Sequence, residues 1–151
     1  MAGSGVYILR RLILVISILI TLSYPVLSIT LHELKLEILS QVAHGLFNKK
    51  KITIYLADNS FIEKKTDTNR FGIVFVDNCS SADLIVAGSL KHLSKDCLKK
   101  TIFATNYPLF RDRHTIGALF WQKGRPVLIL KRRALERRGL KVKEFLKRYV
   151  R

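Results

Sequence analysis

The sequence predicts an α/β protein with a single domain, in which helices pack on a mixed β-sheet after an N-terminal signal or anchor helix. Three observations predict this class. Between residues 51 and 131, short β-branched and apolar runs alternate with polar connections. Apolar residues have helical spacing before this region, from residue 31, and after it, to the end of the chain. An uncharged apolar run lies near the N-terminus, before the domain that these elements form. We expect residues 1–28 to form the export segment and residues 29–151 one exported α/β domain.

The N-terminal segment has the order of parts that export requires. Arg10 and Arg11 precede the apolar run 12–22, residues 23–25 interrupt it, and Ser28 offers a small residue for cleavage. The alternatives are an uncleaved signal anchor and a buried core helix. Cleavage or anchoring both place the domain in the periplasm, either secreted or retained at the membrane.

The remaining elements follow in order. Residues 31–47 place Leu34, Ile38 and Val42 on one helical face, and strands are expected at 51–57, 71–76, 84–87 and 101–105, with a helical turn at 88–93. A hairpin is expected from strands 115–122 and 126–131 around Lys123-Gly124. The chain ends in a helical turn at 134–138 and a helix at 142–150 that turns Phe145, Leu146 and Tyr149 inward.

Net charge separates this chain from most small domains. It is +16 overall, and because only Arg10 and Arg11 precede residue 29, the exported part carries 25 basic and 11 acidic residues. Such a charge attracts anionic lipid, polyanions or an acidic partner. The run 131–151 combines helical apolar spacing with dense Lys and Arg, which suits a membrane face or an acidic protein, whereas export argues against nucleic acid.

The two cysteines, Cys79 and Cys97, both lie in the exported part. In an oxidising compartment they are expected to form a disulfide worth about 3 kcal/mol. Two reduced, buried thiols remain the alternative, while metal binding is disfavoured because no second ligand stands at the required spacing.

Catalytic chemistry has little support in the sequence. The histidines at 32, 44, 92 and 114 are scattered without a nucleophile or carboxylate pattern, and glycine-rich phosphate loops are missing. The sequence therefore predicts a protein that is not an enzyme, with no catalytic residues, no metal site and no cofactor.

One group of aromatic and basic residues follows the strand expected at 101–105. Rings beside guanidinium groups on a loop after a strand favour a site for a planar or anionic ligand or a partner protein, although rings that cap the core beside solvated arginines explain the pattern nearly as well. The candidate residues are Asn106, Tyr107, Arg111, Arg113, Trp121 and Arg125.

A series of motifs runs through the second half of the chain: Gly117 leads a strand, Gly124-Arg125 makes a turn, and Ala134 is followed by Gly139-Leu140 at a helix end. In these motifs the chain resembles the YfiR family of periplasmic regulators, most strongly over 116–142 and more loosely over about 34–150. This chain is shorter between its first two strands and has a more basic end. The resemblance implies a small exported domain, often dimeric, that restrains an inner-membrane signalling enzyme such as a diguanylate cyclase.

Two hypotheses of function follow. The first is a non-enzymatic periplasmic regulatory or sensing protein that acts on an inner-membrane enzyme of the diguanylate cyclase or sensor kinase type, with Cys79 and Cys97 as a redox-sensitive link. The second is a small solute-binding protein, related to transport receptors, that holds an anion with Asn106, Tyr107, Arg111 and Arg125. Length disfavours the second, because two lobes around a cleft need about twice this chain.

Overall fold

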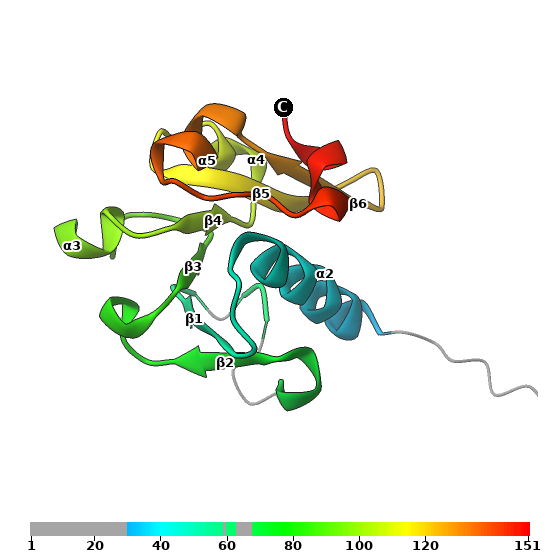
Figure 1. Cartoon of the computed structure of the whole chain (residues 1–151), viewed down its shortest axis with the longest axis horizontal. Coiled ribbons are helices and arrows are strands. Elements are labelled where there is room, and N and C mark those ends of the chain that lie inside the picture. The colour runs from blue at the N-terminus through cyan, green and yellow to red at the C-terminus, as the bar shows by residue number, and fades with distance from the viewer. Residues whose placement is uncertain (1–29, 59, 63–67) are drawn as a thin grey trace, which may run out of the picture. The chain divides into compact units, whose positions relative to one another are not determined.

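A computed structural model describes residues 30–58, 60–62 and 68–151 (Figure 1). Contacts divide the chain into two units, residues 1–30 and Leu31–Arg151, and all the helices and strands described belong to the second unit. The predicted export segment at 1–28 lies outside the described residues. Within the described ranges, no helix is long and apolar enough to cross a membrane.

The predicted α/β class and mixed sheet are confirmed. Six strands form one sheet in the order β2-β1-β3-β4-β5-β6. Neighbouring strands are parallel from β2 through β5, and only the β5–β6 pair is antiparallel. The strands are β1 (Ile52–Leu56), β2 (Ile73–Val76), β3 (Leu84–Ala87), β4 (Ile102–Ala104), β5 (Thr115–Gln122) and β6 (Arg125–Leu130).

Short helices occupy the connections between the parallel strands. The 3-10 helix η1 (Asn69–Phe71) precedes β2, and η2 (Cys79–Ser81) lies in the brief return from β2 to β3. Helix α3 (Lys95–Leu98) precedes β4, and α4 (Tyr107–Phe110) precedes β5. The first five strands therefore end at one edge of the sheet, here called the carboxyl edge, and begin at the opposite, amino edge.

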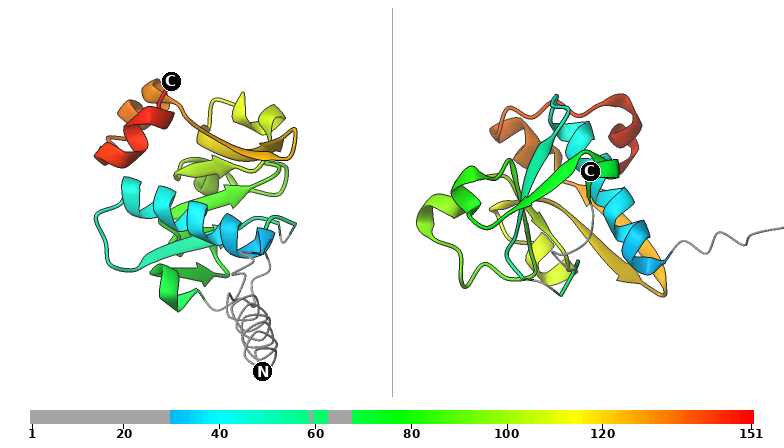
Figure 2. Two further views of the ribbon diagram at one scale, coloured as in Figure 1. Left: turned by 90° about the vertical axis from the view of Figure 1, so that its right-hand side faces the viewer. Right: turned by 90° about the horizontal axis from the view of Figure 1, so that it is seen from below.

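The larger core lies on the face that α2 (Leu31–Leu46) covers (Figures 1 and 2). Leu36, Leu39 and Val42 of α2 are fully buried and pack with Phe103, the largest fully buried side chain. Helix α5 (Arg132–Arg137) and the 3-10 helix η3 (Glu144–Tyr149) add further apolar contacts on this side. The predicted helix thus provides one layer of the fold, but its buried face is centred on Leu36, whereas Leu34 and Ile38 of the predicted face are only partly buried.

The opposite face of the sheet has a smaller core with thinner cover. Ile85 and Ile102 are fully buried there with Cys97, and partly buried side chains from η2, α3 and α4 surround them. Figure 1 shows α3 on the side of the sheet away from α2. No long helix covers this face in the described part of the chain, so its stability depends on short segments that are held together locally.

The predicted hairpin is confirmed, and its turn explains its register. Lys123 and Gly124 have φ angles of 50° and 75°, the two positive values that a type I′ turn requires. Gly117 lies where β5 and β6 approach closely, because a Cβ atom there would meet the carbonyl oxygen of Ile129 at 2.5 Å. Glycine is therefore needed at 117 by the close approach of two strands and is favoured at 124 by its positive φ angle.

Two helical predictions are wrong in position or type. Residues 88–93 form turns, and the helix begins only after Ser94, whose hydroxyl accepts from the Cys97 N–H. The last helix is the 3-10 helix η3, which buries Leu146 but leaves Phe145 47% exposed. The Phe145 side chain therefore does not face inward as predicted.

Candidate functional site

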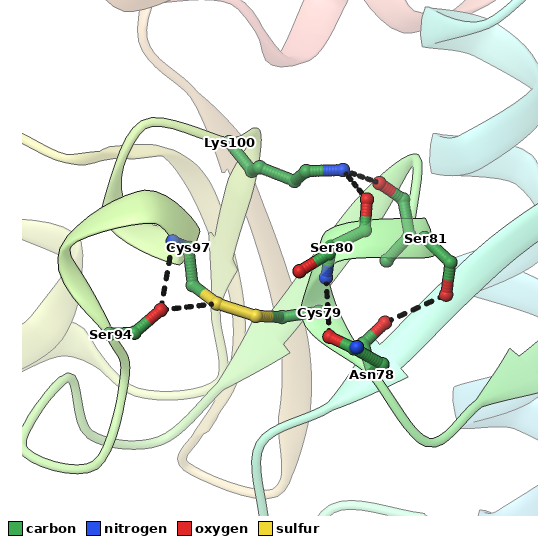
Figure 3. Close-up of a disulfide and its surroundings, with 8 residues drawn as sticks. Asn78, Cys79, Ser80, Ser81, Ser94, Cys97 and Lys100 are labelled. Atoms are coloured by element: carbon green, nitrogen blue, oxygen red, sulfur yellow. Dashed lines mark hydrogen bonds between the residues drawn. A yellow bond between two sulfur atoms is a disulfide. The ribbon is translucent and has the colours of Figure 1, made fainter.

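The predicted pair Cys79 and Cys97 is joined in a disulfide, with Cα atoms 5.8 Å apart (Figure 3). This distance lies within the usual disulfide range. The bridge connects η2, before β3, to α3, before β4, over the smaller core. Lys100 supports the same junction by donating to the carbonyl oxygens of Ser80 and Ala82.

Asn106, a predicted ligand residue, has a structural role at the carboxyl edge. Its side-chain oxygen accepts from the Leu109 N–H at 2.8 Å and so caps α4. Its amide nitrogen donates to the Gly88 carbonyl oxygen at 2.8 Å, which joins the end of β4 to the end of β3. Because the oxygen and the nitrogen of its amide are both hydrogen-bonded within the protein, Asn106 stabilises the carboxyl edge.

The two predicted aromatic residues lie on opposite faces of the sheet. Tyr107 contacts Phe120, with ring centroids 5.6 Å apart, whereas Trp121 lies near Lys35 of α2. Successive residues of a strand point to opposite faces of the sheet, so the Phe120 side chain, which Tyr107 contacts, lies on one face and the Trp121 side chain on the other. Tyr107 and Trp121 are therefore not brought together in one site.

The three predicted arginines are also dispersed. Arg111 and Arg113 follow α4 and immediately precede β5, so they lie toward the amino edge, whereas Arg125 begins β6 at the hairpin turn. All three are exposed. Asn106 and Tyr107 stay together at the start of α4, but the other four candidate residues lie elsewhere, so the site expected for a solute-binding protein does not form as one cluster.

A hydrogen-bonded cluster closes the carboxyl edge between β1 and β3. The Asp58 carboxylate accepts from the Gly88 N–H at 2.9 Å and the Ser60 N–H at 3.0 Å, and also from the Ser60 hydroxyl. Partial burial alone would raise the pKa of Asp58, but these hydrogen bonds and one from Phe61 hold it below its ordinary value. The charged form of Asp58 therefore fixes this edge.

Acid is expected to destabilise the fold partly through Asp58. A carboxyl whose pKa is lower in the folded state stabilises that state above the unfolded pKa and loses the contribution as pH falls. The free energy of unfolding should drop below about pH 4. In denaturant titrations between neutral and acid pH, the free energy of unfolding of Asp58→Asn should fall less steeply than that of wild type. The exposed Asp96→Asn is the control and should fall as wild type does. The same dependence of the unfolding free energy on pH in all three proteins would contradict the role of Asp58.

Basic side chains line a polar groove at the amino edge, here called the basic groove. It is lined by Lys99 and Lys100 at the end of α3 and by Arg137 and Arg138 at the end of α5, with Asp83 as its acidic residue. The groove has a volume of about 470 Å³. Segments almost forty residues apart in sequence thus combine their charges.

Of the four cationic side chains, Lys99 is paired with Asp96, which is not part of the lining, at a distance of 3.2 Å between Nζ and Oδ1. Arg138 donates to the carbonyl oxygens of Lys99 and His114, and the Asp83 carboxylate is bound by Lys49 and by the Thr53 N–H and hydroxyl. Partial burial and the charge of Arg137 lower the pKa of Arg138. An anionic group that enters the groove would relieve this repulsion among like charges.

The sequence indicated the basic C-terminal run but not the groove. Lys99-Lys100 and Arg137-Arg138 are both basic pairs at helix C-termini, where positive charge complements the helix dipole. That local explanation is sufficient for each pair. The two pairs come close together only in the folded chain, where the Arg138 side chain donates to the Lys99 carbonyl oxygen.

Among the residues that the structure describes, no three His, Cys, Asp or Glu side chains are grouped closely enough to hold a metal ion. Comparison with protein-family models gives no match, and comparisons with curated proteins and with solved structures give none either. The basic groove and the disulfide junction are therefore interpreted from their own chemistry.

Proposed function

We propose that this protein is a non-enzymatic periplasmic regulator that binds an acidic surface of an inner-membrane signalling enzyme through the basic groove. The observation that carries this proposal is the convergence of four cationic side chains around one polar depression: Lys99, Lys100, Arg137 and Arg138. Charge complementarity of this kind guides association and selects the partner. A diguanylate cyclase or sensor kinase with an exported domain is the proposed class of partner.

The sequence supports the same proposal independently. The segment 1–28 has the features of an export signal, and the chain resembles a family of periplasmic regulators over about 34–150. A disulfide between Cys79 and Cys97 suits an oxidising compartment. These features support a regulator that acts outside the cytoplasm and is held at, or released from, the membrane.

The composition of the groove favours a protein partner over a lipid surface. Its lining consists of charged side chains and the hydroxyl-bearing Thr101, with Ala82 as the small apolar member. Stable binding to a membrane usually needs an apolar face that enters the acyl region as well as positive charge. Acidic side chains on a folded partner match this lining more closely.

Capture of the full chain from detergent-solubilised membranes of its own cell tests the proposal. The expected result is recovery of an inner-membrane signalling enzyme with an acidic exported domain. Reversing two exposed charges by Lys99→Glu with Arg137→Glu should reduce recovery about tenfold or more, because like charges then face each other. The control, Lys91→Glu with Lys123→Glu, makes the same change in net charge away from the groove and should leave recovery unchanged.

Two outcomes would contradict the proposal. Equal loss in both double variants would show that total charge, not the groove, determines binding. Binding to anionic phospholipid vesicles that depends on Lys99 and Arg137, without recovery of any signalling enzyme, would assign the groove to the membrane surface instead.

A further inference from the structure

A second site lies at the carboxyl edge, whereas the basic groove lies at the opposite, amino edge. Residues after β1 and β4, the first turns of α2 and the end of β5 surround a pocket of about 330 Å³. Small-molecule sites in parallel sheets are found outside the carboxyl ends of the strands. The pocket residues are Leu31, Lys35, Ser60, Phe61, Thr105 and Trp121.

Two of the six residues that line this pocket are aromatic. Phe61 is only 7% exposed, and Trp121 is partly buried against the larger core. Leu31, which is 56% exposed, stands at the start of α2. Flat rings on the wall favour a ligand with a planar apolar body, because ring contacts add to the gain from apolar burial.

The polar centre of the pocket is the ammonium group of Lys35. Its Nζ atom lies 5.1 Å from the centroid of the Phe61 ring and 5.6 Å from that of Trp121, and donates to the Phe61 carbonyl oxygen at 3.1 Å. An ammonium carries three hydrogens, so this contact leaves donors for an acceptor on a ligand.

The sign of this charge selects the ligand. Lys35 already occupies the position that a cationic ligand would take over the two rings, so a second cation would be repelled. A carboxylate would form a charge-assisted hydrogen bond with Lys35. We infer that this pocket binds small aromatic carboxylates, with Lys35 holding the carboxylate and Phe61 and Trp121 contacting the ring.

The chain provides its own reporter for this site, because Trp121 is its single tryptophan. Benzoate titrated into the full-length chain in detergent should change the tryptophan fluorescence saturably, with a dissociation constant on the order of 1 mM for so small a ligand. Benzamide, which has the same shape without the charge, should bind about tenfold more weakly or worse, and benzylamine should give no saturable change.

Variants separate the role of Lys35 from general effects of charge. Lys35→Met keeps the aliphatic stem against the rings and removes the ammonium, so benzoate should lose its advantage over benzamide. Lys91→Met removes an exposed lysine outside the pocket and should bind benzoate as wild type does. Circular dichroism of each variant verifies folding, and Lys35→Gln provides a second replacement if the Met variant does not fold.

The inference would be overturned by any of three results. These are no saturable response to benzoate in wild type, equal binding of benzoate and benzamide, or unchanged benzoate binding in Lys35→Met and Lys35→Gln. Equal binding of cyclohexanecarboxylate would overturn the requirement for a planar ring. Because no residue of the basic groove is involved, the inference can fail while the proposed regulatory function stands, and the reverse.

Discussion

Phe103→Ala is expected to lower the free energy of unfolding by about 3 to 5 kcal/mol, the usual cost of removing a large buried aromatic side chain. Phe103 lies on β4, one of the two central strands, and is fully buried in the larger core with side chains of α2. Its loss would leave a cavity between the sheet and the helix that neighbouring side chains fill only in part. Chemical denaturation followed by circular dichroism measures the change.

Phe145→Ala is the matched control for Phe103→Ala. Phe145 is 47% exposed on η3, so its truncation should alter stability by only about 0.5 kcal/mol. The small domain has a total stability of about 5 to 15 kcal/mol, so the Phe103 variant should already be partly unfolded at moderate denaturant concentrations. Comparable losses for both variants would show that the larger core is not built around Phe103 as described.

Removing the disulfide is expected to cost about 3 kcal/mol in the double variant Cys79→Ala with Cys97→Ala. Part of this cost is the greater freedom of the unfolded chain, whose loop spans a separation of 18 residues. The rest is local, because the bridge joins η2 to α3 over a face that has only a small core around Ile85 and Ile102. Guanidinium denaturation measures the cost.

Reducing agent supplies the control for the disulfide. Wild type should lose about the same stability on reduction as the double variant loses by substitution, and the variant itself should not respond. Ser94→Ala, which removes the cap of α3 but keeps the bridge, should cost only about 1 kcal/mol. A reduction-insensitive wild type would mean that the bridge contributes nothing to stability.

The elements that could be predicted from the sequence are those fixed by local chemistry. Lys123-Gly124 specifies the hairpin turn by itself, and the apolar spacing of 31–47 is sufficient for α2. The helical turn expected at 88–93 was wrong in position, because the side chain that caps a helix here is Ser94, which accepts from the Cys97 N–H, and α3 begins after it. Strand order, by contrast, depends on contacts between distant segments.

The end of the chain shows the same limit. Residues 142–150 have helical spacing, but the Lys143 N–H donates to the Gly45 carbonyl oxygen and Leu146 packs beside Gly45. Val150 then bridges to Leu130 in extended form. Six residues remain between these two attachments, and they form the tighter 3-10 helix η3.

The candidate site was predicted least well, because sequence proximity was taken for spatial proximity. Residues 106–113 belong to the connection that carries the chain from the carboxyl edge back to the amino edge, so its two ends cannot share a site. Lys35 and Thr105 were missed for the opposite reason. They are seventy residues apart and meet only because β4 ends beside the first turns of α2.

The strand β6 is an edge of the sheet, and the backbone groups that point away from β5 determine whether another molecule can pair with it. In the register set by the hairpin turn, Pro126, Leu128 and Leu130 direct their backbone groups away from β5. Pro126 has no N–H to offer, and the Leu130 carbonyl oxygen accepts from the N–H of Arg151. A strand from another molecule would thus find few backbone groups along β6 to pair with, which disfavours edge-to-edge aggregation at this edge of the sheet.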